Sequence, residues 1–168
     1  ADLAGQVKRL RDNGIDVIIV TSGAISMGLE KLGYPRDEKP SDLPTLQAAA
    51  ALGQLRLTRA YEDAFEPLGL TIAQVLITRG DTAKRESYLH ARNTIRRLIE
   101  LGTIPLVNEN DTVAVEEICF GDNDTLATLV ATLIDTDLVV LLSDIEGLYT
   151  ADPRIDEDAR LLDEIDTF

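Results

Sequence analysis

Short apolar runs rich in β-branched residues recur along the chain, and each follows a turn or helix-ending signal. The runs predict strands at residues 16–20, 71–77, 104–107 and 138–142. Glycine stands shortly before each of the first three runs, and the polar triplet at residues 135–137 stands before the fourth. Because β-branched side chains suit a pleated buried surface and glycine commonly ends helices, we expect a strand to follow a helix each time.

Amphipathic stretches with apolar residues at helical spacing lie between these runs. They predict helices at residues 3–10, 42–68 (one helix or two), 88–101 and 124–134. Residues 112–120 lack that spacing and indicate a small hairpin or an irregular excursion. Alternating helices and nearly continuous apolar strands predict an α/β fold, a three-layer sandwich whose mostly parallel sheet has helices on both faces. We expect one domain over residues 1–168.

Composition and charge narrow the class of protein. The chain has 168 residues, 45% of them hydrophobic, which is enough for one domain with a substantial core. Its formal net charge of −14 repels nucleic acid and anionic membrane surfaces, so neither partner is expected. No apolar run is long enough to span a membrane, and one cysteine, Cys119, cannot form an internal disulfide. These features predict a cytoplasmic protein.

Polar residues follow the predicted strands where each strand ends. The segments are residues 21–23, 78–81, 108–111 and 143–144. Since ligands of open α/β sheets bind beyond the carboxyl ends of the strands, we expect these segments to share one edge and to carry the chemistry.

The first of these segments, Thr21-Ser22-Gly23, is a turn of small residues that runs into a helix. Backbone N–H groups at a helix start can bind a carboxylate or a phosphate. Glycine in a tight turn also has a purely steric explanation, and residues 21–28 match neither a dinucleotide-binding motif nor a P-loop.

Two acidic, amide-rich bends are the strongest chemical signal. Residues 108–111 (Asn-Glu-Asn-Asp) end the third run, and residues 121–124 (Gly-Asp-Asn-Asp) open a helix. Carboxylates there can accept hydrogen bonds from a substrate ammonium group, and amides can bond either a carboxylate or an ammonium group. An Asx turn would account for one or two residues of the first bend, and a helix cap for one of the second. The remaining residues predict a binding site.

Five segments together resemble the glutamate 5-kinase branch of the amino acid kinase family. They are residues 20–25, 32–35, 107–111, 121–124 and 144–154. The last is typical of the wider family, whereas the two acidic bends at this spacing select the branch. The resemblance extends over essentially the whole chain.

The resemblance implies transfer of the γ-phosphoryl group of ATP to the side-chain carboxylate of L-glutamate, helped by Mg²⁺. It assigns Ser22, Gly23, Asp111 and Asn123 to glutamate binding, Ser143 and Asp144 to ATP binding, and Asp124 to orienting the catalytic lysines. It also implies proline as a feedback inhibitor and a homo-oligomer.

The two lysines that this family uses lie outside the matched segments. Lys8, Lys31, Lys39 and Lys84 stand at neither position. We therefore expect the chain to be a piece of a longer protein, incomplete at both ends and inactive as a kinase alone. Two alternatives stay open. One is another amino acid kinase, acting on acetylglutamate, aspartate or carbamate; the other is a non-catalytic module that senses glutamate or proline.

Overall fold

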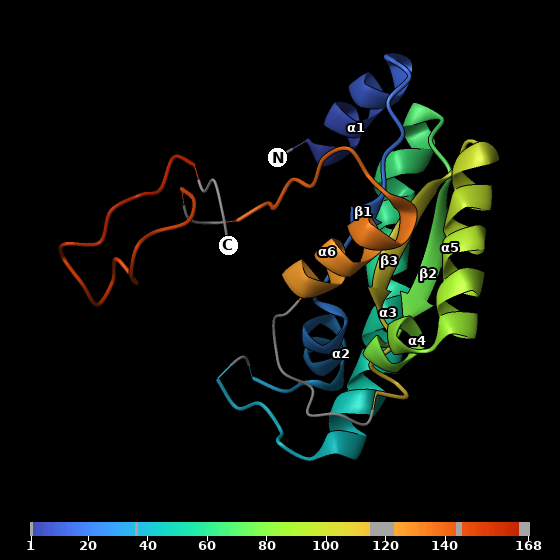
Figure 1. The fold of residues 1–168 in the computed structure, drawn as a ribbon. Coiled ribbons are helices and arrows are strands. Elements are labelled where there is room, and N and C mark those ends of the chain that lie inside the picture. The colour runs from blue at the N-terminus through green and yellow to red at the C-terminus, as the bar shows by residue number, and fades with distance from the viewer. Residues whose placement is uncertain (1, 36, 115–122, 144–145, 165–168) are drawn as a thin grey trace. The chain divides into compact units, whose positions relative to one another are not determined.

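The computed structural model of the protein describes residues 2–35, 37–114, 123–143 and 146–164 (Figure 1). The chain divides into two compact units, Ala1–Leu138 and Val139–Phe168. The first unit contains all the strands and helices named below and is described first.

Three parallel strands form the sheet of the first unit. They are β1 (Ile19–Val20), β2 (Ile72–Ile77) and β3 (Ile104–Glu109), in the order β1-β3-β2. Val20 pairs with Val107, and Ile77 pairs with Glu109. Each strand falls within or overlaps a predicted run, so these three predictions are confirmed. The first strand is shorter than its run.

Helices connect and flank these strands. They are α1 (Leu3–Asp12), α2 (Ala24–Leu32), α3 (Leu43–Phe65), α4 (Arg79–Ala83), α5 (Arg85–Glu100) and α6 (Asn123–Ile134), with a 3₁₀ turn, η1 (Glu66–Leu68), after α3. The stretch predicted as one or two helices is therefore a single long helix. The Asp42 side chain accepts a hydrogen bond from Thr45 N at 3.0 Å, and Pro44 stands in the first turn, which explains the start of α3.

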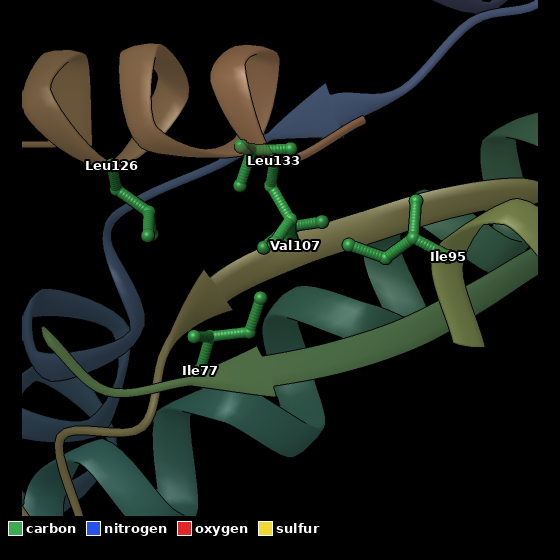
Figure 2. Close-up of a cluster of buried hydrophobic side chains, with 6 residues drawn as sticks. Ile77, Ile95, Val107, Leu126 and Leu133 are labelled. Carbon is green, nitrogen blue, oxygen red and sulfur yellow. The ribbon is translucent and has the colours of Figure 1, made fainter. Parts of the chain in front are cut away.

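Alternate side chains of the strands face two different helical layers. On one face, Ile77 of β2 and Val107 of β3 pack with Ile95 of α5 and with Leu126 and Leu133 of α6 (Figure 2). The opposite face of the sheet packs on α1 and the end of α3, through a cluster that comprises Ala4, Val7, Phe65 and Ile104. Helices thus cover both faces of a parallel sheet, which confirms the three-layer prediction.

Helices α2 and α3 approach each other very closely at two glycines. A Cβ atom on Gly28 would lie 1.8 Å from the backbone oxygen of Ala49, and one on Gly53 would lie 1.6 Å from that of Ala24. No side chain fits in either place. This contact fixes the start of α2, which follows the turn after β1, against the middle of α3.

The strand predicted at residues 138–142 is wrong, because the structure has no strand there. The five apolar side chains of this run are exposed, from 43% for Val139 to 78% for Leu142. An apolar run predicts burial, but a strand also needs a neighbouring strand to hydrogen-bond with. Among the described residues, none of the three strands of the sheet pairs with residues 138–142.

The second unit contains a short antiparallel pairing. Tyr149 pairs with Leu161, and Thr150 N donates to Arg160 O at 2.9 Å. The hairpin or excursion predicted at residues 112–120 lies largely outside the described residues. Within the described part of the chain, none of the helices combines the length and the apolar character that a membrane span requires.

Candidate active site

Three segments meet at the carboxyl edge of the sheet, and their hydrogen bonds define the candidate site. Asn123, the first residue of α6, donates from Nδ2 to the backbone oxygen of Thr21 at 2.5 Å and to Asn108 Oδ1 at 3.3 Å. Thr21 N in turn donates to Val107 O at 2.9 Å, which extends the pairing of β1 and β3 beyond the strand end. The turn after β1 and the end of β3 therefore share one edge, as predicted, and the start of α6 joins them there.

Ser22 and Gly23 lie in the turn between β1 and α2, beside the backbone oxygen that binds Asn123. Both residues are exposed. Gly23 has a φ of 97°, a left-handed conformation that favours glycine, and it immediately precedes the first residue of α2. The steric explanation for this glycine therefore holds, and it is compatible with a backbone approach to a ligand. Binding of substrate by Ser22 and Gly23 stays a prediction.

The four residues of the first bend have separate roles. Asn108 is buried, with 2% of its surface exposed, and donates to Gln54 Oε1 at 2.8 Å. The Asn110 side chain accepts from Thr112 Oγ1 at 2.5 Å, and its backbone oxygen accepts from Val113 N and Ala114 N, both at 3.2 Å. Asn110 thus builds the turn, as the Asx-turn alternative expects for one residue of the bend.

The half-buried Asp111 carboxyl has an unusual proton affinity. Burial, and secondarily the nearby Glu109 carboxylate, raise its pKa from 3.8 to about 6. A carboxylate that water and neighbours stabilise poorly gains most from a cation placed beside it. Asp111 therefore has the chemistry expected of a receptor for a substrate ammonium group. The hydrogen bonds among the described residues do not link it to Ser22 or Asn123.

The other predicted site residues are Asp124, Ser143 and Asp144. Asp124 lies exposed in the first turn of α6, where a carboxylate interacts favourably with the helix dipole. Ser143 is exposed and belongs to the second unit. Asp144 lies outside the described residues. The roles of these three residues stay predictions.

Two polar residues of α3, Gln54 and Tyr61, contact the site residues although the sequence pattern did not assign them to the site. Gln54 is 9% exposed and contacts Asn108, while the Tyr61 hydroxyl lies 3.0 Å from Thr21 Oγ1. Gln54 follows Ala50 by four positions and precedes Leu57 by three, and both of these residues are buried. A polar residue on the apolar face of a helix was therefore the signal available in the sequence.

The fold and this edge define an α/β protein whose polar segments meet at the carboxyl ends of parallel strands, which is where ligands of open α/β sheets bind. Comparison with known sequences identifies the particular family. The profile of the amino acid kinase family matches residues 1–167, and the chain belongs to this family.

Curated relatives with the same name are similar over nearly the whole chain. Glutamate 5-kinase of Myxococcus xanthus (strain DK1622) is 52% identical over 161 residues, which are 96% of this chain and 42% of the relative. Glutamate 5-kinase of Ruegeria sp. (strain TM1040) is 51% identical over 164 residues, which are 98% of this chain and 44% of the relative. The chain thus spans less than half the length of these relatives.

A solved structure described as isopentenyl phosphate kinase has a similar fold. The TM-score is 0.60 at 20% sequence identity, and the match covers 96% of this chain and 70% of the other. At this identity the similarity concerns the fold alone.

Proposed function

We propose that this chain is part of a glutamate 5-kinase, which transfers the γ-phosphoryl group of ATP to the side-chain carboxylate of L-glutamate. The support is membership of the amino acid kinase family together with 52% identity to a protein named glutamate 5-kinase over 96% of the chain. The complete enzyme is longer than the chain, since the relative is matched over 42% of its length.

One structural observation carries the proposal: the Asn123 amide joins the turn after β1 to the end of β3. Ser22 directly follows Thr21, whose backbone oxygen accepts the hydrogen bond from Asn123. Asp111 follows the last residue of β3 by two positions. A carboxylate of the amino acid would bind at the turn and the start of α2, and its ammonium group would face Asp111. The side-chain carboxylate is then the attacking group.

This assignment explains why the site needs no nucleophile of its own. The acceptor carboxylate of L-glutamate attacks phosphorus directly, so the protein positions the reactants and stabilises charge on the transferring group. Asp111, Asn123 and the backbone of the turn hold the acceptor. Asp124, at the start of α6, would orient cationic groups contributed by other parts of the complete protein.

ATP supplies the phosphoryl group when bound, and Ser143 with Asp144 are the residues of this chain that we assign to it. Among the described residues, no group of three or more His, Cys, Asp or Glu side chains is arranged to hold a metal ion. We propose Mg²⁺ as the companion of ATP without assigning ligands to it.

The test is ADP release by the full-length protein with L-glutamate, with the acyl phosphate trapped by hydroxylamine. We expect turnover with L-glutamate and none with N-acetylglutamate, aspartate or carbamate. Asp111→Asn should weaken glutamate binding, whereas Asp63→Asn on the exposed side of α3 removes the same charge and should not. Turnover with another acceptor, or no turnover at all, would refute the proposal.

Two further parts of the proposal come from the family resemblance. Proline would compete with glutamate for the same pocket, and the protein would assemble into a homo-oligomer. Proline titration in the same assay tests the competition, and light scattering of the purified full-length protein tests the assembly.

A further inference from the structure

Three amide side chains, of Asn123, Asn108 and Gln54, and the hydroxyl of Thr58 form a continuous hydrogen-bonded network, whose two middle members are buried. Asn123 contacts Asn108, Asn108 contacts Gln54, and Gln54 contacts Thr58 one turn further along α3. Gln54 and Asn108 are at least nine-tenths buried, so each depends on protein partners for its hydrogen bonds. The orientation of each amide group is therefore determined by its neighbour.

The Thr58 hydroxyl determines which atoms of this network donate hydrogen bonds and which accept them. The hydroxyl donates its single hydrogen to the backbone oxygen of Gln54 at 2.9 Å. The hydroxyl oxygen can then only accept, and it accepts from Gln54 Nε2 at 3.3 Å. The Gln54 amide is thereby oriented with Nε2 toward Thr58 and Oε1 toward Asn108.

The orientation of Gln54 determines that of Asn108 and, through it, that of Asn123. Asn108 donates from Nδ2 to Gln54 Oε1 at 2.8 Å, which turns its own Oδ1 toward Asn123. Asn123 donates from Nδ2 both to Asn108 Oδ1 and to the backbone oxygen of Thr21. Since both bonds use the nitrogen, Oδ1 is the Asn123 atom not engaged by them.

We propose that Gln54 is a positioning residue, which orients the Asn108 amide and through it makes Asn123 present its carbonyl oxygen to the bound amino acid. This inference rests on the proposed function, in which Asn123 contacts L-glutamate. An oxygen acceptor matches the ammonium group of the substrate, whereas a flipped Asn123 would present donors of the wrong polarity. Gln54 acts on the substrate only through Asn108 and Asn123.

The central variant is Gln54→Met in the full-length protein, because methionine has a similar shape and no strong acceptor. Asn108 Nδ2 would lose its partner, and the orientation of the next amide would no longer be determined. We expect KM for L-glutamate to rise about tenfold, the effect of one lost buried hydrogen bond. KM for ATP should stay the same, and kcat should change much less than KM.

Gln54→Glu is the conservative variant that should rescue binding. Its carboxyl group offers an oxygen acceptor to Asn108 in either protonation state, and the neutral form also donates to Thr58. We expect KM for L-glutamate within about twofold of the wild type, even if the protein is less stable. Leu57→Ala is the matched control, since Leu57 is buried on the same helix and lies outside the network. It should lower stability and leave KM unchanged.

Thr58→Val provides a second test that does not depend on Gln54→Met being folded. It removes the hydroxyl that orients Gln54, and we expect KM for L-glutamate to rise about threefold. An unchanged KM in both Gln54→Met and Thr58→Val, or in whichever of the two folds, would overturn the positioning role. An equal rise in KM for Leu57→Ala would also overturn it. Wild-type protein without glutamate-dependent ADP release would overturn the proposed function and the positioning role together.

Discussion

Replacing Asp111 by asparagine removes a carboxylate that the folded protein stabilises poorly, and we expect the variant to be more stable at neutral pH. Burial and the Glu109 carboxylate raise the pKa of Asp111 from 3.8 to about 6. If that whole rise in pKa opposed folding, it would lower the free energy of unfolding by about 3 kcal/mol, since a shift of one pKa unit corresponds to about 1.4 kcal/mol. Solvent around the half-buried carboxyl screens part of it, which leaves about 1 kcal/mol.

The sign of this effect sets its pH dependence. A carboxyl whose folded pKa is raised destabilises the fold when it is ionised, so the penalty is absent below about pH 4 and complete above about pH 6. The gain of Asp111→Asn should therefore be near zero at about pH 4, grow through about pH 5, and level off by about pH 7. Urea unfolding followed by circular dichroism across this range measures the difference in unfolding free energy between variant and wild type.

Two controls separate this mechanism from a general effect of charge. Asp63→Asn changes the net charge equally at an exposed position and should show no such pH-dependent gain. In a Glu109→Gln background the gain of Asp111→Asn should shrink, because one of the two causes of the raised pKa is gone. A gain that is equal at acid and neutral pH, or a loss of stability at neutral pH, would refute the reasoning.

Three further changes test the packing of the first unit by the same unfolding measurement. Gly53→Ala places a Cβ atom 1.6 Å from the backbone oxygen of Ala24, so it should destabilise the protein by about 1–3 kcal/mol or more. The control Gly80→Ala should not destabilise it, because the nearest atom to its Cβ would lie at 3.6 Å. Equal effects of the two variants would contradict the close contact between α2 and α3. Ile95→Ala empties a fully buried position between α5 and the sheet and should lower stability by about 2–5 kcal/mol, against about 1 kcal/mol for Ile95→Val. Thr78→Ala removes the capping box of α4 and should destabilise by about 1 kcal/mol; an unchanged free energy of unfolding would contradict a stabilising role of the box.

The sheet was predictable where burial and pairing coincide. In β2 and β3, alternate side chains pack against helices on opposite faces, so both strands read as apolar runs that a pattern search detects. Residues 138–142 have the same apolar character and form no strand. Hydrophobicity reports the preference of each side chain, whereas a strand also depends on a partner elsewhere in the chain, and the local pattern carries no information about that partner.

The alternation of side chains along β3 explains why the two asparagines of the first bend behave differently. Val107 faces α5 and α6, while Ile104 faces α1 and the end of α3. Because the side-chain period of a strand is two, Asn108 must lie on the same face as Ile104, toward α3, where Gln54 meets it. Asn110 lies beyond β3, where the backbone turns, and its side chain serves that turn. Strand parity, applied to polar as well as apolar positions, therefore assigns Asn108 to a buried network before any partner is known. The partner itself required the structure, because Gln54 is separated from Asn108 by 54 positions in the chain.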